Sequence, residues 1–260
     1  MPKVDIAVVD MDGTLLDDAG SLPAGFAELL ADMDTAGMLL IPASGRQCTT
    51  LQHMFAPFPQ VRTFIAENGS VVRHHGELID SAALDPTAVT AVLKAATKAG
   101  YVAVRCHADC AYLEPTTDEV MAEISKYYRA HEVVDDVTAV AGDVVKLAIF
   151  DPDDAETGAY PLLQDVGKHL SVALSGKHWV DLMMPGRDKG TGVRAIQRSL
   201  GVSPQRTAVF GDYLNDLPMM GCGQYSYAMA NAHPDIIAAA NYQAPANTEA
   251  GVLRVLREWV

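Results

Sequence analysis

Three short apolar runs, each followed at once by a polar cluster, constrain the fold of this chain more than any other feature. The runs are Val4–Val9, Leu39–Ala43 and Thr207–Phe210. Short β-branched runs that alternate with helical patterns predict βαβ units and a parallel sheet. Because open α/β sheets place their ligand crevice at the carboxyl ends of the strands, we expect the three polar clusters to meet there.

The middle of the chain has a different pattern, which predicts a second unit inserted into the first. A hairpin is expected around 70–79, and a helix opens at Asp85-Pro86 and stops at Gly100, with proline in its first turn and glycine after its last. The remaining elements expected before 185 are strands at 101–106, 144–150, 170–174 and 178–183 and helices at 117–130 and 154–168. This is typical of an α+β sheet with helices on one face.

The βα alternation resumes near the C-terminal end. It predicts a helix over 190–200, a short helix near Leu217, a strand over 225–229, a helix over 234–240 and a last helix from Thr248. We therefore expect a doubly wound, Rossmann-like parallel-sheet core made of residues 1–83 and 186–260, with an α+β cap inserted at 84–185.

Composition excludes several function classes. A chain of 260 residues that is 49% hydrophobic can bury a large core. Its net charge of −14 opposes binding to nucleic acid or to an anionic membrane surface, and every apolar run is shorter than the roughly 20 residues that span a bilayer. The N-terminus lacks a signal-peptide pattern and the four cysteines do not suggest a disulfide scaffold, so we expect a cytoplasmic protein. Nothing in the sequence indicates an oligomeric state.

The polar cluster after the first run is Asp10-Met11-Asp12-Gly13-Thr14. A turn at Gly13 can bring the carboxylate of Asp12 beside that of Asp10, which supplies a nucleophile and a group that transfers protons. Acidic residues with glycine also form ordinary turns and helix caps, and that interpretation competes for this cluster taken alone. Two further clusters at strand ends favour the functional interpretation.

Those further clusters are Ser44-Gly45-Arg46 and the segment 211–216, which contains Asp212, Asn215 and Asp216. Several carboxylates in one site repel one another, so we expect a divalent cation there, and oxygen ligands favour Mg²⁺. Thr14, Ser44 and Lys189 can donate hydrogen bonds or positive charge to phosphate oxygens. This equipment is typical of phosphoryl transfer.

The pattern resembles the haloacid-dehalogenase (HAD) superfamily in its Cof-type branch with an α/β C2-type cap. The motifs that carry the resemblance are DMDGTLL at 10–16, SGR at 44–46, ENG at 67–69, the lysine at 189 and GDxxNDxxM at 211–219. Their order and spacing fit over the whole chain. The resemblance implies that Asp10 attacks phosphorus and that Asp12 protonates the leaving oxygen and then activates water.

The resemblance also implies roles for the neighbouring residues. Mg²⁺ would be held by Asp10, Asp12 (through its backbone carbonyl) and Asp212. The phosphate would be bound by Met11, Thr14, Ser44, Gly45, Lys189 and Asn215. We expect Asp216, Arg46 and Asn68 to lie next to these groups and to orient them.

Candidates in the cap are Lys146, Arg105 and His107. Lys146 interrupts an apolar run, so we expect it to face a crevice or a partner carboxylate. The segment from Cys106 to Cys110 could be a metal knuckle, but no second Cys/His group stands at suitable spacing for zinc. His178-Trp179 could contact a substrate, although the alternation of residues there is typical of an ordinary strand.

The function we expect is a Mg²⁺-dependent phosphatase that hydrolyses a small phosphomonoester, such as a sugar phosphate, flavin mononucleotide (FMN) or pyridoxal phosphate (PLP), through an aspartyl-phosphate on Asp10. A phosphomutase or phosphotransferase of the same superfamily is the nearest alternative. A metabolite-binding module without catalysis is a further alternative, although it would not need this set of carboxylates.

Overall fold

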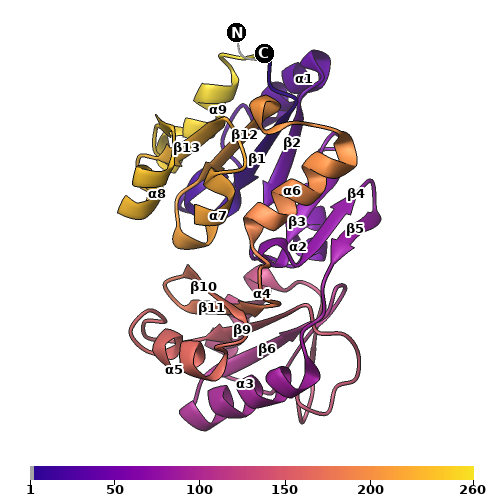
Figure 1. The fold of residues 1–260 in the computed structure, drawn as a ribbon, viewed down its shortest axis with the longest axis vertical. Coiled ribbons are helices and arrows are strands. Elements are labelled where there is room, and N and C mark those ends of the chain that lie inside the picture. Colours follow the sequence, from indigo (N-terminus) through magenta and orange to yellow (C-terminus); the bar gives the residue numbers. More distant parts are fainter. Residues whose placement is uncertain (1–2) are drawn as a thin grey trace.

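The computed structural model describes residues 3–260, in which two β-sheets with their helices lie one above the other (Figure 1). The core sheet has β1 (Ile6–Asp10) near its centre, paired in parallel with β12 (Thr207–Gly211) and β2 (Leu39–Ala43). The two ends of the chain therefore form one parallel sheet, as predicted. All five residues of β1 are buried, which is why its sequence is a continuous apolar run rather than an alternating one.

The outer strands of the core sheet differ on its two sides. Beyond β12 lie β13 (Tyr225–Met229) and β14 (Tyr242–Ala244), which continue the parallel pairing. Beyond β2 lie β3 (Thr63–Ala66), β4 (Val71–His74) and β5 (Glu77–Ser81), of which the last two are antiparallel to their neighbours. The predicted hairpin around 70–79 is thus confirmed as β4 and β5.

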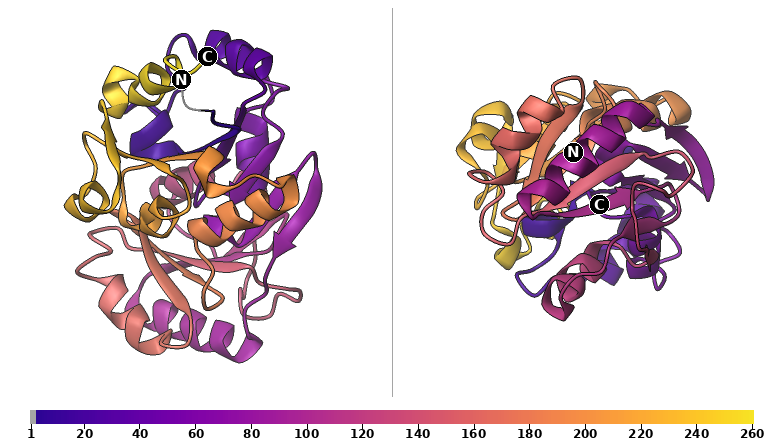
Figure 2. Two further views of the ribbon diagram at one scale, coloured as in Figure 1. Left: turned by 45° about the horizontal axis from the view of Figure 1, so that its top comes forward. Right: turned by 90° about the horizontal axis from the view of Figure 1, so that it is seen from below.

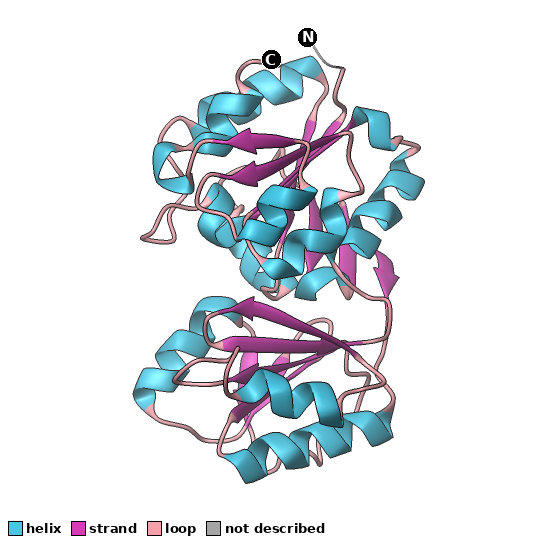
Figure 3. Cartoon of the chain, turned by 60° about the vertical axis from the view of Figure 1, so that its left-hand side comes forward, coloured by secondary structure: helices cyan, strands magenta, loops and turns pink. Residues whose placement is uncertain are grey.

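Helices cover both faces of the core sheet (Figure 3). α1 packs against α9, while α6 packs against α7 and across β3, β4 and β5. The core helices are α1 (Phe26–Ala36), α2 (Cys48–Met54), α6 (Lys189–Leu200), α7 (Leu217–Met220), α8 (Pro234–Ala239) and α9 (Gly251–Leu256). This arrangement confirms the doubly wound α/β core.

The second sheet is mainly antiparallel and has the order β10, β11, β9, β6, β7, β8. Its strands are β6 (Val102–Cys106), β7 (Ala111–Leu113), β8 (His131–Val133), β9 (Lys146–Phe150), β10 (Ser171–Gly176) and β11 (Trp179–Met183). Its helices α3 (Pro86–Ala99) and α5 (Ala159–Val166) cover the face that points away from the core, as the view from below shows (Figure 2).

The alternation of side chains along β11 determines which of its residues face the core. Val180 and Leu182 are buried in the apolar cluster formed with α3 and α5. Because neighbouring strand residues point to opposite faces, Trp179 and Asp181 point the other way, toward the core. α4 (Asp118–Tyr127) also lies on this inner face, where Figure 1 shows it between the two sheets. The prediction of helices on one face is therefore wrong for α4.

Several short elements were not predicted. They are α2, β7, β8 and β14, and the predicted helix 117–130 ends earlier, at Tyr127, as α4. The predicted helix 154–168 begins only at Ala159, because the Asp154 carboxylate accepts the backbone N–H of Glu156 and Thr157 and closes a turn instead. Strands of three residues are too short for a periodic sequence pattern.

Two connections join the sheets, one from β5 to α3 and one from β11 to α6. We propose domain boundaries at 83/84 and 185/186, both of which fall in these connections. Among residues 3–260, none of the helices has the length and apolarity needed to cross a membrane.

Candidate active site

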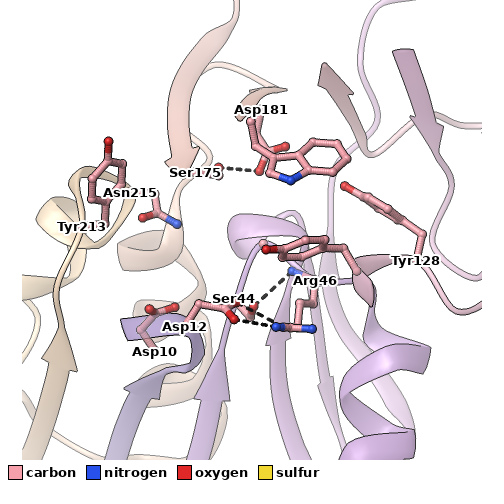
Figure 4. A pocket seen from close by; sticks show the side chains of 12 residues that line it. Asp10, Asp12, Ser44, Arg46, Tyr128, Ser175, Asp181, Tyr213 and Asn215 are labelled. Carbon is pink, nitrogen blue, oxygen red and sulfur yellow. Dashed lines mark hydrogen bonds and ion pairs between the residues drawn. The ribbon is translucent and has the colours of Figure 1, made fainter. Parts of the chain in front are cut away.

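A small cavity lies between the carboxyl end of β1 and the inner face of the cap (Figure 4). Its volume is about 50 Å³. In Figure 4, Asp10, Asp12 and Ser44 lie on the core side and Asp181 and Ser175 lie opposite them. The full lining is Asp10, Asp12, Ser44, Gly45, Arg46, Tyr127, Tyr128, Ser175, Trp179, Asp181, Tyr213 and Asn215.

Lys189 forms the electrostatic centre beneath this cavity. It is the first residue of α6, which Asp188 caps through a hydrogen bond from the Thr191 N–H at 2.7 Å. Its ammonium group is fully buried and donates to Asp10 and, at 2.7 Å, to Oδ1 of Asp216. Burial alone would lower the pKa of Lys189, but attraction by the two carboxylates outweighs burial and raises it.

Asp212 lies beside Asp10 at the end of β12. The Thr14 hydroxyl donates to its Oδ1 at 2.9 Å. Gly13 has a positive φ of 72°, and a Cβ there would collide with the Asp212 carboxylate, so the turn after β1 needs glycine to bring these residues together. Thr14, which the resemblance assigns to phosphate, is thus hydrogen-bonded to Asp212 in this structure.

Clustering of carboxylates raises their pKa values. Burial, and then repulsion by Asp216, raise the pKa of Asp10 well above its ordinary value, while Lys189 opposes this. Burial and Asp216 likewise raise the pKa of Asp212 to about 7. One oxygen from each of Asp10, Asp212 and Asp216 lies within 4.8 Å of the others. A divalent cation would relieve this repulsion, so the donor set fits a hard cation such as Mg²⁺.

The three acidic residues are not equivalent as metal ligands. Asp216 is fully buried, its Oδ1 accepts from Lys189, and its Oδ2 accepts the backbone N–H of Asp212 and of Tyr213. These bonds suit an anchor that holds the 211–216 loop against Lys189. Asp10 and Asp212 keep oxygen atoms for a metal ion, whereas the Asp12 carboxylate lies outside this cluster.

Asp12 points away from Asp10 and pairs with Arg46. The guanidinium donates from Nη2 to Oδ1 at 2.6 Å and from Nε to Oδ2 at 3.2 Å. Its Nη1 donates at 2.8 Å to the carbonyl of Lys126, and its centre lies 4.8 Å from the Tyr127 ring. A core residue next to the candidate acid/base therefore also contacts α4 of the cap. Ser44 faces the same cavity, and its Oγ accepts the backbone N–H of Arg46 at 3.1 Å.

Asn68 connects the core to the cap directly. Its side-chain oxygen accepts from Asn215 Nδ2 at 3.0 Å. Its own Nδ2 donates to Ser175 Oγ at 2.8 Å and to Asp181. The residue stands in a tight turn with a positive φ of 51°, a conformation that asparagine tolerates better than most residues.

Lys146 is paired with carboxylates, as the sequence suggested, but it does not line the cavity. It is fully buried, lies 2.7 Å from Oε2 of Glu67 and 3.5 Å from Oδ2 of Asp181, and donates to the Gly45 carbonyl at 2.6 Å. Burial lowers its pKa, but Asp181 and Glu67 outweigh burial and raise it. The lysine thus bonds the cap to the backbone of the Ser44-Gly45-Arg46 turn.

The structure does not bring the other two cap candidates to the cavity. Arg105 donates to the carbonyls of Val137, Thr138 and Gly142, at 3.2 to 3.4 Å, and to His107 Nε2 at 3.2 Å. Arg105 therefore attaches the long loop before β9 to β6, and His107 accepts one of its hydrogen bonds. Met11, expected at the phosphate, is fully buried in the core cluster, so only its backbone could serve there.

Sequence reasoning missed most of the cap residues at the cavity, Tyr127, Tyr128, Ser175 and Asp181, and also Tyr213 of the core. It named Trp179 but favoured a structural role for it. A signal was present in Asp181, a carboxylate inside an otherwise apolar strand, as Lys146 is in its own strand. Which carboxylate pairs with which lysine depends on sheet pairing, which that signal does not contain.

Comparison with known proteins agrees with this geometry. A family model described as haloacid dehalogenase-like hydrolase matches residues 7–256. The chain belongs to this family, and the resemblance inferred from its motifs is confirmed. It is accordingly an enzyme, a phosphatase of the HAD type.

Three similar proteins show how far the likeness extends. The chain is 29% identical over 258 residues to 5-amino-6-(5-phospho-D-ribitylamino)uracil phosphatase of Escherichia coli K12, covering 98% of this chain and 95% of that protein. It is 25% identical over 240 residues to HMP-PP phosphatase of Cronobacter sakazakii, covering 90% and 86%. A crystal structure from Streptococcus mutans UA159 has the same fold, with a TM-score of 0.89 at 24% identity and 98% coverage of both chains.

Proposed function

We propose that this enzyme hydrolyses a small phosphomonoester in a Mg²⁺-dependent reaction through an aspartyl-phosphate on Asp10. The observation that carries the proposal is the position of the Asp10 carboxylate, which lines the cavity while Lys189 holds it from beneath. The phosphatases named among its relatives support the reaction class.

In the first step an oxygen of Asp10 forms a bond to phosphorus and the bond from phosphorus to the leaving oxygen breaks. Asp12 gives its proton to that oxygen. In the second step Asp12 takes a proton from water, the water oxygen bonds to phosphorus, and the bond to Asp10 breaks, which regenerates the carboxylate. The Asp12 side chain lines the cavity and is 49% exposed, and Arg46 holds both of its oxygens in this structure.

Lys189, Ser44 and Asn215 are the groups that we assign to the phosphoryl oxygens, together with backbone N–H groups of the Met11 turn and Gly45. Mg²⁺, held by Asp10, Asp212 and the carbonyl of Asp12, would supply positive charge that neutralises the phosphate and the carboxylates together. Lys189 favours the ionised form of Asp10, which a nucleophile requires, against the burial that raises the pKa of Asp10.

The cap favours small substrates. A cavity of about 50 Å³ has room for a few water molecules but not for a sugar or a cofactor. We therefore infer that the cap moves away from the core to admit the substrate and closes over it. Sugar phosphates, FMN and PLP stay candidates, and the relative that acts on a phosphorylated ribitylamino compound adds polyol phosphates to them.

Two alternatives stay open to test. A phosphomutase or phosphotransferase would return the phosphoryl group of Asp10 to an organic acceptor instead of water. A module that only binds a metabolite would show no turnover. The combination of two carboxylates and a buried lysine at one cavity favours hydrolysis over binding alone.

The test is phosphate release from a panel of small phosphomonoesters, with Mg²⁺ and with a chelator, by the wild type and by Asp10→Asn. We expect Mg²⁺-dependent release that falls by at least about 10³-fold in the variant, because the nucleophile is lost. The matched control is Asp32→Asn, which makes the same change at an exposed aspartate on α1 and should keep wild-type release. Release that survives in Asp10→Asn would exclude the mechanism.

A further inference from the structure

Trp179, which lines the cavity, carries a buried hydrogen-bond donor that the reaction does not use. The side chain of Trp179 is buried, with 6% of the residue exposed, and it lines the cavity from the cap side. Its indole Nε1 is inaccessible to solvent and has no acceptor among residues 3–260. A buried donor without a partner costs on the order of 1–3 kcal/mol, and native proteins keep few of them. A ligand acceptor in the cavity would remove this cost.

Aromatic neighbours hold the Trp179 ring in place. Its centroid lies 5.5 Å from that of Tyr127 and 5.1 Å from that of Phe150, both in edge arrangements, and 6.0 Å from that of Tyr128. Such contacts on several sides fix the direction of the N–H group. The donor is therefore oriented before any ligand binds, which lowers the entropic cost of recognition.

Asp181 stands two residues further along β11, so both side chains point to the same face of the cap sheet. Its Oδ2 accepts from Ser175 Oγ at 2.6 Å and from Asn68, and lies 3.5 Å from the ammonium of Lys146. These bonds hold the carboxylate at the wall of the cavity, which it lines. Donor and acceptor thus lie on one wall, roughly two strand residues or about 7 Å apart.

The charge of the lining restricts the leaving group further. The described lining has three carboxylates, Asp10, Asp12 and Asp181, and one cation, Arg46, which is paired with Asp12. Lys146 and Lys189 are buried behind the wall in their own ion pairs. A leaving group with a second anionic group would face a lining with more carboxylates than cations, which disfavours it.

We propose that Trp179 and Asp181 form a recognition site for hydroxyl groups, which selects phosphomonoesters whose leaving group is an uncharged polyol. The indole N–H donates to one substrate oxygen, and the Asp181 carboxylate accepts the O–H of another. Both are specificity-determining residues that contact the leaving group and take no part in bond breaking. The inference rests on the proposed phosphatase function and adds a substrate class to it.

The test compares ribitol 5-phosphate with pentyl phosphate, which has the same carbon chain without the hydroxyl groups. The quantity measured is the ratio of kcat/KM for the two compounds, with Mg²⁺, in the wild type, Trp179→Phe and Asp181→Asn. We expect the wild type to prefer ribitol 5-phosphate. We expect Trp179→Phe to lower the ratio about five- to tenfold, the effect of one lost hydrogen bond, and Asp181→Asn to lower it about tenfold or more.

The matched control is Trp259→Phe, which removes the other indole N–H of the chain at a site packed against Tyr225 and Tyr227 of the core, outside the cavity lining. This variant should keep the wild-type ratio. A merely structural role of Trp179 or Asp181 would lower turnover of both compounds and leave the ratio unchanged, which would overturn the proposal. So would a wild type that prefers pentyl phosphate.

A binding measurement separates this proposal from the phosphatase mechanism. Titration calorimetry of both compounds in an Asp10→Asn background, with and without Trp179→Phe, gives the same ratio from Kd values. If the wild type releases phosphate from neither compound, the proposed phosphatase function fails for these phosphomonoesters. The ratio of the two Kd values then tests the recognition site by itself. Tighter binding of ribitol 5-phosphate that Trp179→Phe weakens supports the recognition site, and equal binding refutes it.

Discussion

Two buried lysines, Lys189 and Lys146, have almost the same local chemistry and lie on opposite sides of one cavity. Each is fully buried and each pairs with two carboxylates, Lys189 with Asp10 and Asp216, Lys146 with Glu67 and Asp181. In both, attraction by the carboxylates raises the pKa against the effect of burial. Their positions differ: Lys189 stands beneath the candidate nucleophile, whereas Lys146 joins the cap to the turn at Gly45.

This difference shows that burial and pKa shifts alone do not tell whether a buried ion pair serves catalysis or structure. Removing one partner of such a pair is costly in either place, because a charge is left buried without compensation. Only the groups around it decide whether it serves the reaction or the placement of the cap. Lys189 contacts Asp10, the candidate nucleophile, whereas Lys146 contacts Asp181 and the Gly45 carbonyl, which line the cavity without touching Asp10.

The largest effect is expected from Lys189→Met. Without the ammonium group, Asp10 and Asp216 repel each other in a buried site, and Asp10 loses the charge that favours its ionised form. We expect kcat to fall by about 10³-fold, measured by phosphate release under saturating Mg²⁺. A decrease of less than tenfold would show that Lys189 has mainly a structural role, the role that we predict for Lys146.

A second effect is expected from Lys146→Met, and it should be on stability. Glu67 and Asp181 would be left without their cation, so the free energy of unfolding should fall by about 3–5 kcal/mol in urea titrations. We expect kcat to fall far less than in Lys189→Met. Adding Glu67→Gln to Lys146→Met should recover part of this free energy, because Glu67 then no longer carries a buried charge without a cation. A fall in kcat equal to that in Lys189→Met would show that the two lysines do not differ in role.

A third expectation concerns pH and the metal. The pKa of Asp212 is raised from 3.8 to about 7, so without metal its contribution to stability is full below pH 3.8 and is lost as pH rises through about 7. Mg²⁺ binds the ionised carboxylates, so its stabilising effect should be larger at about pH 8.5 than at about pH 5.5. Thermal unfolding with and without Mg²⁺ measures this. Asp212→Asn should reduce the Mg²⁺ effect at the higher pH, and an equal effect at both pH values in the wild type would contradict the assignment.

The smallest effect is expected from Arg46→Lys. A lysine keeps the positive charge but cannot hold both oxygens of Asp12 and the Lys126 carbonyl together. We expect kcat to fall about tenfold, a loss of orientation rather than of charge. Lys126→Ala is the matched control, because Arg46 bonds only the backbone at that position. Wild-type kcat in Arg46→Lys would show that the direction of Asp12 does not depend on the bidentate pair.

Prediction from the sequence was most successful for the core. Continuous apolar runs predict buried parallel strands, and residues at the carboxyl ends of such strands must share one edge of the sheet. Asp10, Asp12, Ser44 and Asn215 do line one cavity, with Lys189 beneath it. The catalytic and metal-binding roles of these residues stay predictions until the variants are measured.

Prediction was weakest where the cap meets the core. Arg105 and His107 were candidates for substrate contact, but they lie beside Tyr112 of β7, and Arg105 bonds the loop before β9. Trp179 was assigned to an ordinary strand, which is correct for its backbone and incomplete for its side chain. Antiparallel pairing between distant segments determines which face each strand presents, and local periodicity does not carry that information.

The sequence by itself determined the sheet core, the set of groups that could act on a phosphate and the presence of a second unit, because these depend on local periodicity and on residues close together in the chain. Only the tertiary structure decided which carboxylate pairs with Lys146, that Arg46 contacts both Asp12 and the cap, and that Trp179 offers a donor without an acceptor among the described residues. Those features arise where segments far apart in the chain pack together, as Asn68 and Asp181 do across 113 positions. Their contacts depend on the position of the cap over the core, which no single segment specifies.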